Sequence, residues 1–136
     1  MPTTEVSEDT IRETTEAHSR WVNREEDGRR ADFSNIDGQG LDLSGACLAG
    51  ARFFGADLKG ADLSGADLRL ANFVEADLSW ASFEGADLKG ADFRGADLRD
   101  ANLEEADMRE ATMHDANIEG ASYSPQQVNQ WNERLD

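Results

Sequence analysis

The side chains in this chain that could do acid–base, nucleophilic or metal chemistry are two histidines, one cysteine and 29 acidic residues. His18 falls in a segment whose pattern predicts a helix and His114 falls in a predicted turn, so we do not expect the two imidazoles to meet. Cys47 is the only cysteine, which excludes an internal disulfide and a cysteine-rich metal site. No Ser-His-Asp set, phosphate-binding loop or metal-ligand spacing is present. The sequence therefore predicts no enzyme activity, no cofactor and no metal site with histidine or cysteine ligands.

The most regular set of ionisable side chains is four aspartates spaced twenty residues apart, Asp37, Asp57, Asp77 and Asp97. Short Asp and Asn side chains bond to nearby backbone groups in turns, which gives this set a structural interpretation. A row of outward carboxylates would also form an acidic face that imitates the phosphate backbone of DNA. A third hypothesis is that stacked carboxylates hold divalent cations. The spacing leaves all three open.

The chain has 136 residues, with 29 acidic against 13 basic side chains and a net charge of −16. Affinity for nucleic acid or for an anionic membrane needs clustered Lys and Arg, so this balance argues against direct binding to either. It favours a protein partner with a basic surface. The acidic N-terminus does not resemble a signal peptide, and no apolar run is long enough to span a membrane. We therefore expect a cytoplasmic protein.

The carboxylates belong to a tandem repeat, because residues 31–125 divide into 19 five-residue units without an insertion. Each unit has a small residue first, usually Ala, and a large apolar residue third, so both point to the same side of an extended segment. The second residue, mostly Asp or Asn, points outward, and the last two suit a turn. Units this short cannot bury their own apolar residue, whereas stacked coils can. The repeat therefore predicts an all-β solenoid.

The number of units in a coil follows from the phenylalanines at the third position. Phe33, Phe53, Phe73 and Phe93 are spaced twenty residues apart, which is four units. We therefore expect a coil of square section, with these four rings stacked as a core ladder along one inner face. Nineteen units then make just under five coils.

This repeat resembles that of the pentapeptide-repeat family, whose motif is A(D/N)LXX, and the units ADLKG at 56–60 and 86–90 match it fully. The resemblance implies a right-handed quadrilateral β-helix. The first coil departs from the motif, because Ile36 and Leu41 replace the small residue and Gly38 replaces the large one. We expect this coil to be irregular, with side chains from the N-terminal segment filling the gap.

The segments at the two ends predict short capping helices. Residues from about Glu8 to Arg24 form a sparse apolar face behind Ser7, a suitable N-cap. At the other end Ser124 and Pro125 suit a helix start, and apolar residues follow at Val128, Trp131 and Leu135. The predicted organisation is an N-terminal segment (1–30), the repeat (31–125) and a C-terminal helix (126–136). A partner-binding arm and a dimer contact are the respective alternatives.

Four large apolar residues fall at outward or turn positions, where this chain otherwise avoids them: Phe54, Leu70, Val74 and Trp80. Phe54 and Val74 are predicted one coil apart on one outer face, with Leu70 at the preceding corner and Trp80 at a later one. A patch of this kind marks an interface with a partner or a second copy. Harmless exposure is the other interpretation.

The features together predict a non-catalytic interaction or scaffold module that presents a rigid acidic surface. The family resemblance implies an alternative, because some pentapeptide-repeat proteins are acidic dimers that mimic duplex DNA, bind DNA gyrase and protect it from fluoroquinolones. On that alternative, the acidic face would bind gyrase. The sequence leaves open a monomer or an end-to-end homodimer.

Overall fold

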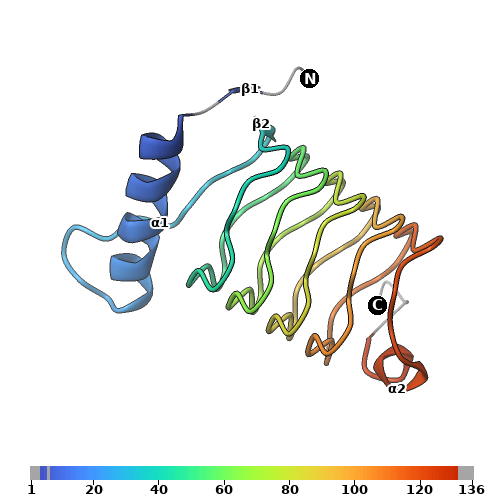
Figure 1. Ribbon diagram of the computed structural model, residues 1–136. Coiled ribbons are helices and arrows are strands. Elements are labelled where there is room, and N and C mark those ends of the chain that lie inside the picture. Colours follow the sequence, from blue (N-terminus) through green and yellow to red (C-terminus); the bar gives the residue numbers. More distant parts are fainter. Residues whose placement is uncertain (1–3, 6, 132–136) are drawn as a thin grey trace.

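A computed structural model describes residues 4–5 and 7–131 of the chain. Figure 1 shows a stack of similar coils with one helix beside each end. The named elements are β1 (Thr4–Glu5), α1 (Glu8–Val22), β2 (Ile36–Asp37) and α2 (Pro125–Val128), and β1 pairs in parallel with β2. Among the described helices, none has the length and apolar character needed to cross a membrane.

The coils are held together by parallel pairing between residues exactly one coil apart in the repeat, such as Asp57 with Asp77 and Asp77 with Asp97. Each third-position N–H donates to the next coil, as Leu58 N does to Asp77 O at 2.8 Å, and each second-position N–H donates to the previous coil. Every unit from residue 51 to residue 105 thus bonds in both directions along the stack. The result is a coil of twenty residues with four sides.

The second-position Asp and Asn side chains complete the backbone bonding of their own units. In unit after unit the side-chain Oδ1 accepts the N–H two residues later, for example Ser79 N to Asp77 at 3.1 Å and Val74 N to Asn72 at 2.9 Å. A backbone N–H without a partner costs free energy wherever water is excluded. The structural interpretation of the aspartates therefore accounts for their regular spacing.

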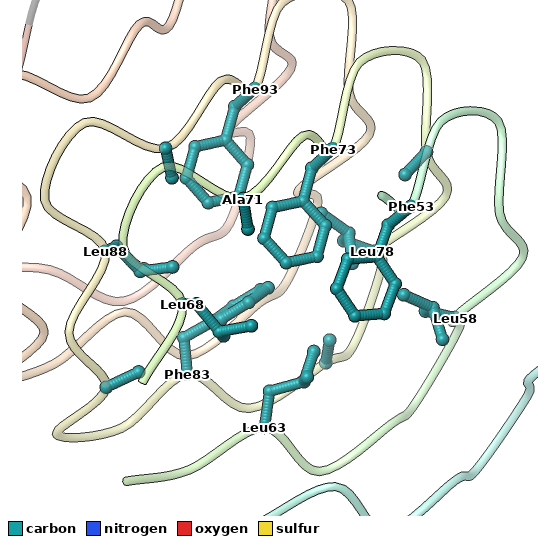
Figure 2. Packing of buried hydrophobic residues seen from close by; sticks show 14 of the residues in the cluster. Phe53, Leu58, Leu63, Leu68, Ala71, Phe73, Leu78, Phe83, Leu88 and Phe93 are labelled. Atoms are coloured by element: carbon teal, nitrogen blue, oxygen red, sulfur yellow. The ribbon is translucent and has the colours of Figure 1, made fainter. Parts of the chain in front are cut away.

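The interior is filled by the first and third residues of each unit. Rings of Phe33, Phe53, Phe73 and Phe93 stack with centroids 4.8 to 5.3 Å apart. Figure 2 shows Phe83 approaching this column from the opposite side, with its ring edge-on to Phe73 and Phe93 at 5.6 and 5.8 Å. Alanines fill the remaining width, so the described core leaves a dry, narrow interior.

The corners require an unusual backbone conformation. Every fifth residue from Asn35 to Gly120 has a positive φ, which glycine adopts without strain and bulky residues adopt at a cost. Most of these corners hold Gly, Asn, Asp or Glu. Leu70 (φ 60°) and Trp80 (φ 63°) are the large apolar exceptions.

Inside the first coil, the place of the large residue missing at Gly38 is filled by a local exchange of large and small residues. A Cβ on Gly38 would lie 2.8 Å from Leu58 Cδ2, 2.9 Å from Leu41 Cδ1 and 3.1 Å from Ile36 Cδ1. The space that a large third residue would take is therefore already occupied. Ile36 and Leu41, which replace alanine on either side of Gly38, supply two of those three methyl groups.

Helix α1 begins behind Ser7, whose hydroxyl accepts the N–H of Thr10 at 3.2 Å, and it buries Ile11 and His18 against the first coil. The imidazole Nδ1 of His18 accepts Ala31 N at 2.8 Å, and its Nε2 lies 2.7 Å from Ala49 O. Since Nδ1 accepts, Nε2 carries the proton and donates to Ala49. The helix ends at Val22 and leaves Trp21 and Val22 on the surface.

Helix α2 is held to the last described coils mainly by glutamine. Gln127 is buried, and its Nε2 donates to Leu103 O and Ala106 O at 2.5 and 3.0 Å while its Oε1 accepts Ser124 N at 2.7 Å. Trp131 is buried beside Tyr123, with ring centroids 5.5 Å apart. Val128, one of the three apolar residues noted in the sequence, is exposed, and Leu135 lies outside the described residues.

Candidate functional site

The outward surface of the coils divides into four faces, which we name after their inward residues in the second coil: the Phe53, Leu58, Leu63 and Leu68 faces. The Leu63 face consists of residues 41–45, 61–65, 81–85, 101–105 and 121–125, and it contains no Lys or Arg. Its five carboxylates are all exposed: Asp42, Asp62, Glu84, Glu104 and Glu105. Serine hydroxyls donate to two of them, Ser44 to Asp42 at 2.6 Å and Ser64 to Asp62 at 2.5 Å. This face is acidic without internal compensation.

The acidic row predicted from the sequence lies on the Leu58 face, where Asp37, Asp57, Asp77 and Asp97 pair consecutively along the stack. All four are half-buried. Asp57 accepts Gln39 Nε2 at 2.7 Å, and Arg99 binds Asp97 at 2.6 Å. The hydrogen bond from Arg99 lowers the pKa of the Asp97 carboxyl. This row is therefore partly neutralised, and it shares its face with Lys59 and Arg99.

On the Leu68 face, unlike the Leu63 face, cations at the fourth position neutralise the carboxylates at the second position. Arg69 binds Asp67 at 2.7 Å and lies 3.7 Å from Asp87, and Arg109 binds Asp107 at 2.6 Å. The hydrogen bonds that Arg69 donates to Asp67 raise the pKa of Arg69. Sequence reasoning did not single out the Leu63 face, although the absence of Lys and Arg from one unit in every four would have identified it.

The four apolar residues predicted as one patch do not share one environment. Phe54, Leu70 and Trp80 are 42%, 71% and 67% exposed, whereas Val74 is half-buried. Leu70 lines a surface groove with Trp21 and Val22 of α1. Phe54, Val74 and Trp80 do not line that groove.

This groove, of about 640 Å³, runs between the end of α1 and the corner that joins the Leu68 and Phe53 faces. Its lining consists of Trp21, Val22, Arg24, Ala49, Gly50, Arg69, Leu70, Lys89, Gly90 and Glu110. Apolar side chains and glycine backbone thus form its floor, with basic side chains beside them. Sequence reasoning missed it, because α1 and the corner are brought together only by the docking of His18.

The Trp21 ring at the edge of the groove is held in place from two sides. The His18 ring lies 5.2 Å away, and the guanidinium of Arg30 lies 5.7 Å from the Trp21 ring centroid. Arg30 Nε also donates to Gly50 O at 2.6 Å. The ring is therefore positioned before any ligand arrives.

The residues singled out for chemistry are dispersed. Cys47 is exposed on the Leu68 face, His18 is buried with both ring nitrogens bonded, and His114 lies 3.2 Å from Asp115. Within residues 4–5 and 7–131, no three His, Cys, Asp or Glu side chains gather closely enough to hold a metal ion. The stacked aspartates thus bond to backbone N–H groups and to arginine.

Comparison with known proteins agrees with this architecture. The sequence pattern of one family, described as pentapeptide repeats, matches in eight copies over residues 29–54, 51–90 and 86–122. A crystal structure of alr5209, a pentapeptide repeat protein from Nostoc Pcc 7120, is similar over 91% of this chain and 100% of that chain, at 26% identity and a TM-score of 0.68. None of the curated proteins compared with this chain matches it.

Two further solved structures are similar to this chain. AT2G44920, a pentapeptide repeat protein from the Arabidopsis thaliana thylakoid lumen, is 33% identical over 74% of this chain and 63% of that one, with a TM-score of 0.48. A trypsin-treated variant of QnrB1, a plasmid-mediated fluoroquinolone resistance protein, is 24% identical over 71% and 63%, with a TM-score of 0.51. The likeness to QnrB1 is one of fold. Members of this family fold as right-handed quadrilateral β-helices, and this chain belongs to the pentapeptide-repeat family.

Proposed function

We propose that this chain is a non-catalytic interaction module whose Leu63 face binds a basic surface on a protein partner. The observation that carries the proposal is the set of five exposed carboxylates on a face without Lys or Arg. On the other three faces arginine binds a neighbouring carboxylate, as Arg94 binds Asp92 at 2.7 Å on the Phe53 face. The Leu63 face therefore keeps its full charge for a partner.

The rigidity of the coils supports this role. Carboxylates on adjacent coils are carried by backbone segments about 4.8 Å apart, and they need no rearrangement to present a continuous charged strip. Such a strip steers a basic partner during encounter and fixes its register. We further propose that the repeat forms just under five coils and that α1 and α2 cap its two ends, since open strand edges invite aggregation.

A DNA-mimicking modulator of DNA gyrase is the second candidate. It is favoured by the acidity of the chain and by the fold that it shares with QnrB1, whose description is a fluoroquinolone resistance protein. The Leu63 face would then occupy a surface that otherwise binds DNA phosphates. An end-to-end homodimer would lengthen the acidic strip.

Two matched variants test the proposal. The first, Asp62→Asn with Glu84→Gln and Glu104→Gln, removes three charges from the Leu63 face. The second, Asp57→Asn with Asp77→Asn and Asp97→Asn, removes three from the Leu58 face. Asn keeps the turn bond of a second-position Asp, as Asn72 shows at 2.9 Å. Both variants should therefore fold.

The readout is quantitative mass spectrometry of proteins captured from the source cells on the immobilised wild type and the two variants. We expect basic partners to be lost from the Leu63 variant and kept by the Leu58 variant. Loss from the Leu58 variant alone would assign the surface to the row predicted from the sequence. Equal loss from both would mean that only net charge matters, and the proposal of a defined face would be abandoned.

Gyrase supercoiling, with the mass of the protein in solution measured alongside, tests the second candidate. Inhibition by a low micromolar concentration of wild type, weakened in the Leu63 variant, would support DNA mimicry. An absence of inhibition would remove gyrase and leave the interaction module.

A further inference from the structure

We propose that the groove between α1 and the Leu70 corner binds a peptide segment that combines an apolar anchor with flanking carboxylates. This goes beyond the proposed function, because the partner segment is acidic and the Leu63 face is not involved. The inference rests on three features: the strained backbone and exposed side chain of Leu70, the apolar floor of the groove beside it, and the basic residues that line the groove.

The conformation of Leu70 is the first step. It holds φ at 60°, where glycine would fit without strain, and it is 71% exposed, so its side chain gains little from burial. The corners directly before and after it on the stack are Gly50 and Gly90. A bulky residue in this conformation is costly, and such strain concentrates at binding sites. Leu70 therefore points to a role outside the fold of the free chain.

The surroundings of Leu70 form a preorganised apolar floor. The Leu70 side chain lies across Gly90, where a Cβ would be 2.7 Å from Leu70 Cδ2, and the Trp21 ring lies 3.6 Å from the corresponding position at Gly50. Trp21 is 41% exposed and Val22 is 40% exposed. Glycine at both neighbouring corners keeps the floor open. A ligand side chain can therefore contact Trp21, Val22 and Leu70 together.

The charge around this floor is opposite to that of the chain. Arg24, Arg69 and Lys89 line the groove, against one carboxylate, Glu110. Arg69 is bound to Asp67, whereas the side chains of Arg24 and Lys89 form no hydrogen bond or salt bridge with the residues that the structure describes. Lys89 acts on Asp107 only through its charge, so its ammonium group and the guanidinium of Arg24 can each bind a carboxylate of a ligand directly.

The net charge of −16 does not prevent an acidic ligand from binding here. Charges separated by more than about 10 Å are largely screened at 0.1 M salt, so distant carboxylates act weakly on a ligand in the groove. Among the residues that line the groove, three cations outnumber the one carboxylate, Glu110. Nucleic acid is disfavoured, because its long backbone would extend past the groove over the surrounding carboxylates. The groove therefore suits a short acidic segment of a protein.

The probe is a panel of three fluorescein-labelled peptides, each with two glutamates on either side of a Leu-Phe, Trp-Leu or Leu-Leu pair. Binding to the full chain is followed by fluorescence anisotropy. We expect at least one peptide to bind saturably and to bind more weakly as salt is raised. Replacing its glutamates with lysines, or its apolar pair with two serines, should reduce the affinity at least about tenfold.

Leu70→Gly separates a binding role from a structural one. It relieves the strained φ, so the variant should be at least as stable as wild type, yet it should weaken peptide binding about tenfold through loss of apolar contact. The matched control is Trp80→Gly, which relieves φ of 63° at a corner outside the groove and should leave the affinity unchanged.

The role of charge is tested with Lys89→Glu, which we expect to weaken peptide binding about threefold to fivefold. The matched control is Lys59→Glu, which changes a fourth-position lysine outside the groove and should leave the affinity unchanged. The Leu63-face variant should bind the peptide as wild type does, so failure here is distinct from failure of the proposed function. The inference is overturned if none of the three peptides binds, if Leu70→Gly binds normally, or if the lysine peptides or a single-stranded oligonucleotide compete equally well.

Discussion

The coils after Gly50 and the first coil, residues 31–50, fill the same square interior in different ways. From Ala51 to Ala111 every unit begins with alanine. The residue at the third position of each unit is fully buried from Phe53 to Met108. In the first coil Ile36, Gly38 and Leu41 have exchanged sizes, and His18 of α1 accepts a hydrogen bond from Ala31 N and donates one to Ala49 O. Its packing depends on contacts that no other coil repeats.

This difference indicates which substitutions should destabilise the whole stack and which should destabilise only its N-terminal end. In the regular coils each residue packs against equivalent residues of the previous and the next coil. The effect of a substitution in one coil is therefore transmitted to both neighbouring coils. The first coil has another coil on one side only, and on the other side it is completed by β1 and α1. Changes in the middle should therefore act on the whole stack, whereas changes at the N-terminal end should act on α1 and its neighbours.

Removal of a ring from the middle of the phenylalanine column should have the largest effect. Phe73 lies within 5.6 Å of three other rings, whereas Phe33 has one such contact, with Phe53 at 5.3 Å. Phe73→Ala should lower the free energy of unfolding by about 3–5 kcal/mol. Phe33→Ala should cost about 2 kcal/mol, because the end can relax. Urea unfolding checks both values, and equal losses would contradict the distinction between middle and end.

Loss of the histidine anchor should be the next largest effect. His18→Ala leaves Ala31 N–H and Ala49 C=O without their partners, and we expect a cost of about 2–4 kcal/mol. Hydrogen exchange should show faster opening of α1 and the first coil, while the coils beyond Gly50 keep their protection. The control is Glu13→Ala on the exposed side of α1, which should change stability by less than about 0.5 kcal/mol.

Acid should weaken the same anchor without a substitution. Burial lowers the pKa of His18, with a further lowering by Arg30, while the Ala49 hydrogen bond and Asp67 oppose it. Protonation would also place a proton on Nδ1, where Ala31 N–H donates. Since the folded pKa lies below the ordinary value of about 6.5, the stabilisation is complete above that pH and is lost as the pH falls below it.

Hydrogen exchange of α1 at pH 7 and pH 5, corrected for intrinsic rates, measures this effect. Opening of α1 should increase at pH 5 in the wild type, and the increase should disappear in His18→Ala. The same increase in both proteins would assign the pH dependence to another group.

The exchanged sizes around Gly38 predict a smaller, non-additive effect. Gly38→Leu restores the motif residue, yet the new side chain would meet methyl groups of Leu58, Leu41 and Ile36, so it should destabilise by about 1–3 kcal/mol. Adding Ile36→Ala and Leu41→Ala opens the space and should return most of that loss. Thermal unfolding of the single and triple variants checks this, and a triple variant less stable than the single one would contradict the exchange.

The same contrast explains how much the sequence could predict. The spacing of five and twenty residues fixes the inward and outward positions, because one register repeats without insertion, and so Phe73 and Asp77 were placed correctly by counting. His18, Gln127 and the groove at Leu70 depend on how a helix docks on the stack, and a single helix carries no repeated pattern that reveals its register. The sequence predicted a gap at Gly38, because the repeat shows that a large side chain is missing there. It does not show that Ile36, Leu41 and Leu58 occupy the space.

The corners provide the smallest and cleanest comparison, since Gly60 and Trp80 occupy the same corner on adjacent coils. Gly60 has φ 70° with nothing within 4 Å of an added Cβ, so Gly60→Ala tests backbone strain alone and should cost about 1 kcal/mol. Trp80→Gly should gain about 0.5–1 kcal/mol, because the tryptophan is 67% exposed and loses little contact. Chemical unfolding of both variants measures the two changes. A loss of stability in Trp80→Gly would mean that the exposed ring supports the fold, and its strain would then need no external partner to explain it.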